Sequence, residues 1–460
     1  MSGKKHFHFI GIGGTAMGSA AAALRMAGHT ITGSDQKVYP PMSTMLEKCG
    51  INVMEGYKPE NLPADADCIV VGNAISRGNP EVEAVLERRL PYTSLSELLR
   101  CEVLQGRRNF VVTGTHGKTT TTSILAWLLE HAGKNPGYLI GGVPDNFAVG
   151  ARFNPSDFFV IEGDEYDTAF FDKRSKFIHY LPECVIVNNL EMDHADIFDS
   201  IKDIQREFTR MLKLVPRSGC VFLNGDEATC RALIKDCPAP VSTVGTGEDC
   251  EIKIKIVDAA AEHTGFELNG EKFIVPMVGE FNVRNAAMAV CAARHAGLSD
   301  AQIRAALLEF RGVLRRQTER GTVSGVHIID DFGHHPTAIR ETLRGLRQRY
   351  KSARLWALFE PRSNTSRRNL LQNELIAALN EADGSIIAAV NMPEKVPAGQ
   401  LLDVDAVAAA VRAAGREAFH ETGVDAIIAR LKPLVKPGDV VIVFSNGGFE
   451  GIHQKLMERL

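Results

Sequence analysis

The sequence predicts an α/β protein built of three units, each with a mainly parallel, doubly wound sheet. Three observations lead to this prediction. The chain has 460 residues, enough for about three domains of roughly 150 residues each. Short apolar strands alternate with helical segments along its whole length, which is the pattern of βαβ units. Glycine-rich or polar loops follow many of the strands, and open α/β sheets bind their ligands at the carboxyl ends of strands.

The composition is that of an ordinary soluble globular protein. Apolar residues make up 45% and charged residues 23% of the chain, and 52 basic against 56 acidic residues give a net charge of −4. This balance argues against nucleic-acid binding and against a polybasic membrane anchor, since both need a cationic face. Nine cysteines without a C-x-x-C pair indicate reduced thiols, and no apolar run approaches the roughly 20 residues of a membrane span. We therefore expect a cytoplasmic protein.

The first predicted unit, residues 1–106, opens with a strand at 6–10, a glycine-rich turn and a helix that reaches residue 27. Further strands are expected at 30–32 and 68–71. In the turn, Gly11, Gly13 and Ala16 have G-x-G-x-x-A spacing, and Asp35 follows about 20 residues later. Such a turn lets the backbone approach a phosphate at the N-terminus of the helix. These glycines are equally compatible with NAD and with a nucleotide diphosphate.

The second predicted unit, residues 107–312, carries a stronger nucleotide-binding signal. Residues 114–120 read G-T-H-G-K-T-T between a strand predicted at 109–113 and a helix at 119–132. The segment resembles a Walker A loop, although Val112 stands in place of its first glycine. Backbone N–H groups can still cradle phosphates, Lys118 can neutralise the β- and γ-phosphates, and the Thr119 hydroxyl can bind Mg²⁺. Further strands are expected at 157–161, 185–187 and 221–223, with an antiparallel portion at 251–278 and a helix at 282–296.

Two acidic loops follow strands of this second unit. Glu162 begins E-G-D-E-Y-D directly after one apolar strand, and His194 ends E-M-D-H shortly after the next. A metal ion that bridges phosphates needs carboxylate or imidazole ligands opposite the phosphate loop. The two loops therefore predict a metal site.

The third predicted unit, residues 313–460, begins within an Arg-rich stretch at 311–320 that we interpret as a hinge. Strands are expected at 326–329, 354–359, 385–390 and 440–444, and a helix at 405–414. Three polar loops follow strands here: D-D-F-G-H-H-P at 330–336, E-P-R-S-N-T at 360–365 and S-N-G-G-F at 445–449. Because all three come after carboxyl ends of strands, we expect them to share one cleft.

Taken in order, these motifs resemble those of the Mur ligase family, in particular its muramate branch. The resemblance covers essentially the whole chain and includes G-x-x-N-x-x-N at 279–285 and the paired arginines at 315–316. Within that branch, several stretches resemble the enzymes that accept a peptide: 39–44, 72–74, 166–176, 193–198, 360–365 and 445–449. The resemblance implies a three-domain α/β architecture, with a Rossmann-like N-terminal domain, a P-loop central domain and a Rossmann-like C-terminal domain.

The resemblance also implies an activity and a set of partners. The expected reaction is ATP-dependent amide formation between UDP-N-acetylmuramate and the murein tripeptide L-alanyl-γ-D-glutamyl-meso-diaminopimelate, in peptidoglycan recycling, with Mg²⁺ as cofactor. The expected enzyme acts through an acyl phosphate and is a monomer or a weak homodimer.

Each predicted subsite follows from matching these motifs. The UDP-muramyl subsite comprises Gly11, Gly13, Gly14, Asp35, Asn73 and Ser76. The ATP subsite comprises Gly114, Thr115, His116, Gly117, Lys118, Thr119, Thr120, Asn285 and Arg315. The metal ligands are Thr119, Glu162 and His194; Lys118, His194, Arg316, Asp331 and His334 act in catalysis; and Arg362 and Asn364 bind the peptide.

Three other functions stay open at this point. An L-alanine ligase of the same branch would share every nucleotide motif. An NAD-dependent oxidoreductase rests on the turn at Gly11 and on Asp35 alone and leaves the second nucleotide loop unexplained. A non-catalytic nucleotide-binding regulator is disfavoured by Glu162 and His194, each placed just beyond a strand.

Overall fold

A computed structural model describes residues 3–39 and 42–460. Positions 40 and 41, part of the peptide-ligase-like stretch 39–44, lie outside the described residues. The chain forms two compact units, the first made of 1–191, 200–254 and 285–311, the second of 192–199, 255–284 and 312–460. The domain boundaries expected after residues 106 and 312 stay predictions.

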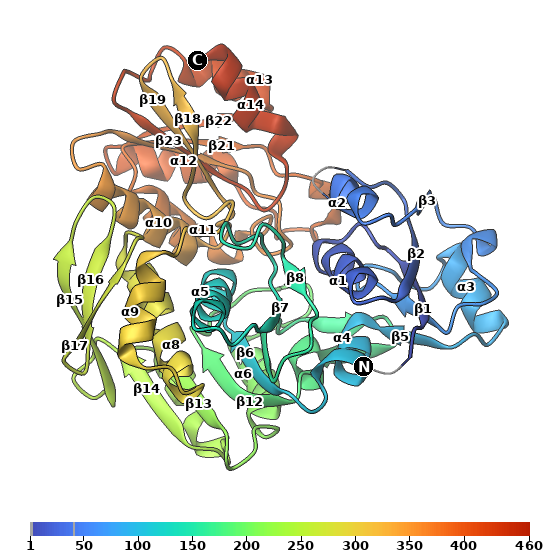
Figure 1. Ribbon diagram of the computed structural model, residues 1–460. Helices are drawn as coiled ribbons and strands as arrows, with labels where there is room; N and C mark the ends of the chain where they lie inside the picture. The colour runs from blue at the N-terminus through green and yellow to red at the C-terminus, as the bar shows by residue number, and fades with distance from the viewer. Residues whose placement is uncertain (1–2, 40–41) are drawn as a thin grey trace. The chain divides into compact units, whose positions relative to one another are not determined.

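The N-terminal part of the first unit is a five-stranded parallel sheet with the order β3-β2-β1-β4-β5. Its strands are β1 (His6–Ile10), β2 (Thr30–Asp35), β3 (Val53–Glu55), β4 (Cys68–Val71) and β5 (Tyr92–Ser94). Helices α1 (Thr15–Met26) and α3 (Pro80–Glu87) lie on opposite faces of this sheet (Figure 1). The order reverses at β1, because β2 pairs on one side and β4 on the other. A crevice for a ligand forms at such a reversal, and the first glycine loop follows β1.

The central part of the first unit has a parallel sheet in the order β14-β13-β12-β6-β9-β7. Its strands are β6 (Arg108–Thr113), β7 (Gly137–Leu139), β9 (Phe158–Gly163), β12 (Pro182–Val187), β13 (Cys220–Asn224) and β14 (Val241–Gly245); β8 (Ala151–Arg152) pairs antiparallel with β7. The helices are α5 (Lys118–His131), α6 (Ile201–Leu212), α9 (Asp300–Leu308) and, from residue 285 onwards, α8 (Glu280–His295). Strand β6 is the reversal point here, and the second glycine loop follows it.

The second unit contains the predicted antiparallel portion and the C-terminal sheet. Strands β16 (Thr264–Leu268) and β17 (Glu271–Val275) form an antiparallel hairpin. The six-stranded sheet has the order β18-β19-β23-β20-β21-β22. Its strands are β18 (Thr318–Val323), β19 (Val326–Asp331), β20 (Leu355–Phe359), β21 (Gly384–Ala388), β22 (Glu417–Glu421) and β23 (Val440–Phe444).

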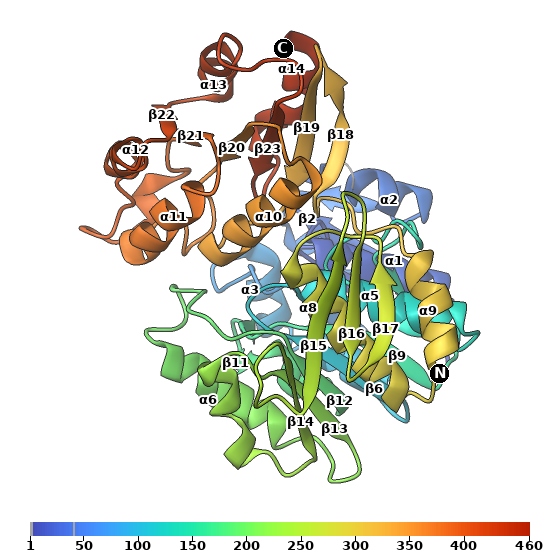
Figure 2. The same ribbon diagram turned by 90° about the vertical axis from the view of Figure 1, so that its left-hand side faces the viewer.

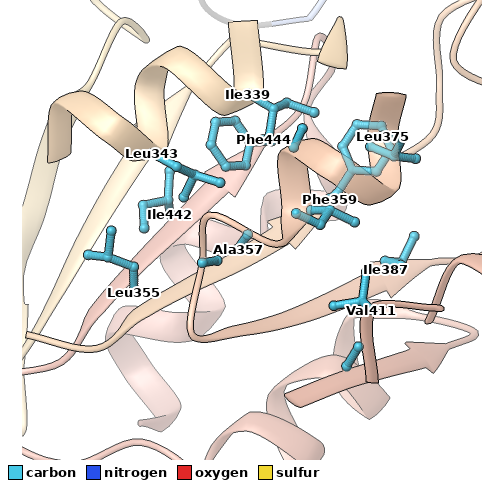
Figure 3. Close-up of a cluster of buried hydrophobic side chains, with 14 of the residues drawn as sticks. Ile339, Leu343, Leu355, Ala357, Phe359, Leu375, Ile387, Val411, Ile442 and Phe444 are labelled. Carbon is cyan, nitrogen blue, oxygen red and sulfur yellow. The ribbon is translucent and has the colours of Figure 1, made fainter. Parts of the chain in front are cut away.

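Strands β20 and β23 are apolar on both sides, as expected of parallel strands buried between two helical layers. Leu355, Ala357 and Phe359 pack into one core with α10 (Pro336–Arg349), α11 (Gln372–Leu379) and α12 (Val404–Ala413) (Figure 3). The alternate residues Trp356 and Leu358 join the other core, with α13 (Val424–Leu431) and α14 (Ile452–Arg459). Figure 2 shows these two helical layers on opposite faces of the sheet. The sequence-based prediction of a mainly parallel, doubly wound fold is confirmed.

The expected hinge at 311–320 is only partly irregular. Residues 318–320 begin β18, which pairs antiparallel with β19 and has a register shift between Glu319 and Gly321. The strand reads T-E-R-G-T-V and none of its residues is buried, so its sequence lacks the apolar alternation of a half-buried strand. No helix in the described ranges is long and apolar enough to cross a membrane.

Candidate active site

The second glycine loop forms a tight turn between β6 and α5. Gly114 has φ +132° and Gly117 has φ +81°, conformations that residues with a Cβ rarely adopt. A Cβ at Gly117 would lie 2.5 Å from Asn285 Oδ1. Gly117 precedes α5, so the loop ends where the free N–H groups of that helix begin. This is the geometry of a phosphate-binding loop.

Lys118, the first residue of α5, is turned back over this loop. Its Nζ donates to Gly114 O at 2.7 Å and to Glu165 Oε2 at 2.9 Å, and Asp164 Oδ1 lies 3.9 Å away. Burial alone would lower the pKa of Lys118, but the facing Glu165 and Asp164 raise it above the ordinary value. The ammonium group is therefore fixed and charged. The sequence did not identify Glu165 as its partner.

Thr119 and Glu162 meet on the other side of the loop. The Thr119 hydroxyl donates to Glu162 Oε2 at 3.3 Å, and Gly141 N donates to Glu162 Oε1 at 2.8 Å. A hydroxyl and a carboxylate are hard oxygen donors of the kind Mg²⁺ prefers, so this pair fits a magnesium site. The neighbouring Thr120 is buried.

Polar contacts from the loop after β12 hold the glycine loop in place. His116 N donates to Asn189 Oδ1 at 2.9 Å, and His116 Nε2 lies 3.0 Å from Glu191 Oε1. Glu191 N donates to the Thr115 hydroxyl at 2.9 Å. His116 and Thr115 therefore use these atoms to fasten the loop, with Asn189 as a partner that the sequence did not reveal.

Asn285, which the family resemblance assigns to the adenine part of the ATP subsite, lies against the phosphate loop. It is buried, and its Oδ1 accepts from the Thr121 hydroxyl at 3.2 Å. Its Nδ2 is buried and has no hydrogen-bond partner among the described residues. Asn285 therefore supports the turn at Gly117, and its contact with adenine stays a prediction.

The first glycine loop is closed by Asp35. Gly11 has φ +83°, and Gly13 N donates to Asp35 Oδ2 at 2.8 Å. Gly14 is exposed at the start of α1. After β4, Asn73 Nδ2 donates to Asp167 O at 2.7 Å, whereas Ser76 is exposed. The role of this loop in holding a diphosphate stays a prediction.

In the second unit, residues 192–199 are fastened to the segment after β20. Asp193 Oδ1 accepts from the Thr365 hydroxyl at 2.6 Å, Asp196 Oδ2 accepts from Asn364 Nδ2 at 2.8 Å, and Ala195 O accepts from Arg368. Burial would raise the pKa of Asp193, but the facing histidines and Thr365 lower it well below the ordinary value. Asp193 thus stays ionised, and its Oδ1 accepts a hydrogen bond from the backbone N–H of His194.

His194 itself has φ +50°, an unusual conformation for a residue with a side chain. It belongs to the second unit, whereas Thr119 and Glu162 belong to the first. Its place in one metal site with them stays a prediction.

Asp331 and His334 lie just beyond the end of β19. The two oxygens of Asp331 accept from Gln317 N at 2.9 Å and Gly333 N at 2.7 Å, and burial raises the pKa of Asp331. Burial also lowers the pKa of His334, partly opposed by Asp193, and its Nδ1 lies 3.1 Å from Phe332 O. His334 is therefore neutral at neutral pH and able to accept a proton.

The two paired arginines differ in their surroundings. Arg315 Nη2 donates to Ser445 O at 2.7 Å and to Gly447 O at 2.8 Å, and Arg315 Nε lies 3.4 Å from Asp330. These contacts join the ends of β19 and β23. The Arg315 and Arg316 guanidinium groups both lie over the Phe332 ring, at 5.0 and 5.1 Å, and Arg316 partly opposes the rise that burial causes in the pKa of Asp331. Nucleotide binding by Arg315 and phosphate contact by Arg316 stay predictions.

The loops after β19, β23 and β20 lie at one edge of the sheet, because these strands are parallel neighbours. That they share one cleft stays a prediction. The Ser445 hydroxyl donates to Glu360 Oε2 at 2.5 Å, and Arg362 Nη1 lies 3.8 Å from Glu360 Oε1. Arg362 packs over Gly447, where a Cβ would lie 2.4 Å from its Nε. Its side chain is 40% exposed. Arg362 can therefore reach a ligand, whereas Asn364 is engaged by Asp196.

Comparison with known proteins places these sites in a family. Three family models match in sequence: "Mur ligase family, catalytic domain" over 6–105, "Mur ligase middle domain" over 112–293 and "Mur ligase, glutamate ligase domain" over 315–447. Together these models cover most of the chain, so the chain belongs to the Mur ligase family, a class of α/β ligases.

Individual relatives narrow this further. The Escherichia coli UDP-N-acetylmuramate–L-alanyl-γ-D-glutamyl-meso-2,6-diaminoheptandioate ligase is 44% identical over 98% of both chains. The crystal structure of a murein peptide ligase from Psychrobacter arcticus is 37% identical, covers 99% of this chain and 98% of its own, and has a TM-score of 0.75. A UDP-N-acetylmuramate–L-alanine ligase from Mesorhizobium japonicum is 34% identical over 96% of this chain and 94% of its own.

Proposed function

We propose that the chain is an ATP-dependent amide ligase that joins UDP-N-acetylmuramate to L-alanyl-γ-D-glutamyl-meso-diaminopimelate in cytoplasmic peptidoglycan recycling. The observation that carries the proposal is full-length similarity to a ligase of that name at 44% identity, against 34% for an alanine ligase. The phosphate loop with its fixed Lys118 supports the use of ATP.

The first chemical step activates a carboxylate. The lactyl carboxylate of UDP-N-acetylmuramate attacks the γ-phosphate of ATP, which gives an acyl phosphate and ADP. Charge spreads over the transferred phosphoryl group, so a fixed cation lowers the barrier. Lys118 supplies that cation from the phosphate loop, and Arg316 is the proposed second one. Thr119, Glu162 and His194 are the proposed ligands of Mg²⁺, which when bound neutralises phosphate charge.

The second step forms the amide bond. The amino group of the incoming substrate attacks the acyl carbon, and inorganic phosphate leaves. Because an α-amino group has a pKa of about 7.7–8.0, a nearby base increases the reactive fraction. His334, held neutral by burial, is the proposed base. The buried Asp331 accepts hydrogen bonds from the backbone N–H groups of Gln317 and Gly333 and so fixes the turn that carries His334.

The amine subsite is proposed at Arg362. The tripeptide carries several carboxylates, and the planar guanidinium binds a carboxylate with two parallel hydrogen bonds. Arg362→Ala should weaken tripeptide use by about 1.5–3 kcal/mol, the range for a hydrogen bond to a charged group. The measurement is kcat/KM for the tripeptide, with ATP binding as the control. Unchanged tripeptide kinetics would remove Arg362 from the subsite.

The experiment that tests the proposed function is an ADP-release assay with each substrate omitted in turn. We expect ADP release only when ATP, UDP-N-acetylmuramate and the tripeptide are all present. We also expect mass spectrometry to detect the amide product. ATP binding without any turnover would instead favour a nucleotide-binding regulator. A shift of nicotinamide fluorescence on mixing with NADH would favour the oxidoreductase.

A further inference from the structure

The segment 166–176 is one of the stretches that resemble the peptide-accepting enzymes, and none of the proposed catalytic or binding residues lies in it. It contains an antiparallel hairpin of β10 (Asp167–Ala169) and β11 (Asp172–Ser175), and Lys176 follows directly. The backbone N–H of Lys176 donates to Tyr166 O at 3.1 Å, and that of Phe177 donates to Asp164 O at 3.4 Å. The hairpin therefore returns the chain to the acidic loop at the end of β9.

Lys176 and the phosphate-loop residue Lys118 face the same carboxylate. Lys176 Nζ donates to Asp164 Oδ2 at 3.3 Å, and Lys118 Nζ lies 3.9 Å from the other oxygen, Oδ1. Lys118 Nζ also lies 2.9 Å from Glu165 Oε2. Asp164 thus stands between two ammonium groups, one on each of its oxygens.

The position of the Lys176 side chain differs from that of a nearby lysine in the same hairpin. Lys176 is 14% exposed, and its Nζ lies 4.0 Å from the centre of the Tyr166 ring, within the range of a cation–π interaction. Lys173 is 69% exposed and pairs with Asp167 at 2.6 Å. An exposed ion pair of that kind contributes little, whereas charges shielded from water interact more strongly.

The charges beside the phosphate loop explain what a second cation does there. The motif that follows Ile161 brings three carboxylates, those of Glu162, Asp164 and Glu165. ATP is itself an anion, so these carboxylates repel its phosphates and compete with them for the Lys118 ammonium. Loss of the Lys176 charge would leave Asp164 facing Lys118 and would draw that ammonium away from the phosphates.

We propose that Lys176 is a positioning residue for ATP: it holds the Asp164 carboxylate, so that the Lys118 ammonium stays available to the phosphates. This inference rests on the proposed use of ATP and adds a residue from outside the phosphate loop. In this role Lys176 acts through Asp164 and Lys118, and not by contact with the reacting atoms.

The first test is the ATP affinity of the full chain, measured by calorimetry in the presence of Mg²⁺. Lys176→Met removes the charge but keeps an unbranched side chain, so ATP should bind about tenfold more weakly. Lys176→Arg keeps the charge and should restore most of the affinity. Equal ATP affinity in Lys176→Met and in the parent would overturn the proposal.

Lys173→Met is the matched control, because it removes the same charge from an exposed ion pair of the same hairpin. Its ATP affinity should equal that of the parent. A loss as large as that in Lys176→Met would show an effect of net charge alone and would overturn the role of the contact with Asp164.

A double-mutant cycle tests the route through Asp164. Asp164→Asn removes the carboxylate that Lys176 holds, so adding Lys176→Met to it should change ATP affinity by less than about twofold. The double variant leaves no unpaired carboxylate at this position, so the comparison with Asp164→Asn stays measurable even where Lys176→Met alone does not fold. The full loss of affinity in the Asp164→Asn background would overturn the proposal.

The parent protein separates this inference from the proposed function. Calorimetry of the parent tests ATP binding itself, so a parent that binds no ATP would contradict the proposed function and this inference together. A parent that binds ATP with the same affinity as Lys176→Met would overturn only the role of Lys176.

Discussion

Lys118 illustrates how one residue serves both stability and chemistry. Its ammonium group is the proposed cation for the transferred phosphate, and it also neutralises Glu165, whose side chain is only 2% exposed. Removing one partner of a buried ion pair costs about 3–5 kcal/mol, because the other charge is left without a counterion. An activity loss in a Lys118 variant can therefore come from either source.

A double variant separates the two roles of Lys118. Lys118→Ala should lower activity by about 10²–10³ and also lower the unfolding midpoint. Lys118→Met combined with Glu165→Gln should recover stability but not ADP release, since no buried charge is left unpaired. Lys213→Ala, an exposed lysine of the same unit, is the matched control. Recovery of turnover in the double variant would contradict a catalytic role for Lys118.

Glu162 carries a prediction about metal binding. Glu162→Gln removes a charged oxygen donor next to Thr119, so the Mg²⁺ concentration for half-maximal ADP release should rise, while turnover at saturating Mg²⁺ is partly restored. Glu60→Gln, an exposed acid, is the control. The same Mg²⁺ dependence in the parent and in Glu162→Gln would remove Glu162 from the metal site.

At the scale of elements, the phosphate loop depends on glycine geometry that can be tested by a matched pair. Gly117 and Gly133 flank α5 with similar φ values of +81° and +75°. A Cβ at Gly117 would strike Asn285, whereas one at Gly133 meets nothing within 4 Å. Both alanine variants carry the backbone cost of about 1–2 kcal/mol.

Only Gly117→Ala should also lose nucleotide affinity, since it must displace the loop. The measurement is ATP binding by calorimetry. Thermal unfolding of both variants measures the loss of stability that the backbone strain causes in each. Equal ATP affinity in the two variants would show that the contact with Asn285 does not shape the loop.

Strand β1 carries a pH prediction. His8 is fully buried and bonded to the Thr32 hydroxyl, and burial, with His6 nearby, lowers its pKa to about 4. In the unfolded chain the His8 imidazole takes up its proton near pH 6.5, whereas in the folded chain it does so only near pH 4. The contribution of His8 to the free energy of unfolding is therefore complete above pH 6.5 and falls as the pH drops towards 4. The loss is about 3 kcal/mol.

His8→Gln should flatten this dependence in urea unfolding between pH 7 and 4.5. His263→Gln, which alters a partly exposed histidine, is the control. An unchanged pH dependence in His8→Gln would contradict the assignment of the acid sensitivity to β1.

The features of the fold and of the candidate site that the sequence predicts are those that depend on local contacts along the chain. Strand–helix alternation and glycine spacing located the sheets and both glycine loops, because these depend on local backbone requirements. The motif E-G-D-E does not show that Glu162, near the end of β9, faces Thr119 while Glu165, just beyond that strand, faces Lys118. The partnership of Asp193 with Thr365 joins residues 172 positions apart and has no local signature.

At the scale of the whole molecule, the choice of amine substrate is the property that divides this branch of the family. The nucleotide loops are common to peptide and alanine ligases, so they do not decide it. Among the polar loops after β19, β20 and β23, the partly exposed Arg362 is the residue proposed to hold an additional carboxylate. The central claim is therefore that this chain ligates a peptide.

The most direct test compares kcat/KM for the tripeptide L-alanyl-γ-D-glutamyl-meso-diaminopimelate and for free L-alanine. Both are measured by ADP release with saturating ATP and UDP-N-acetylmuramate, and the products are verified by mass spectrometry. We expect efficient turnover of the tripeptide. For L-alanine we expect kcat/KM lower by at least about tenfold, which corresponds to the loss of roughly one charged hydrogen bond. More efficient turnover of free L-alanine than of the tripeptide would contradict the central claim.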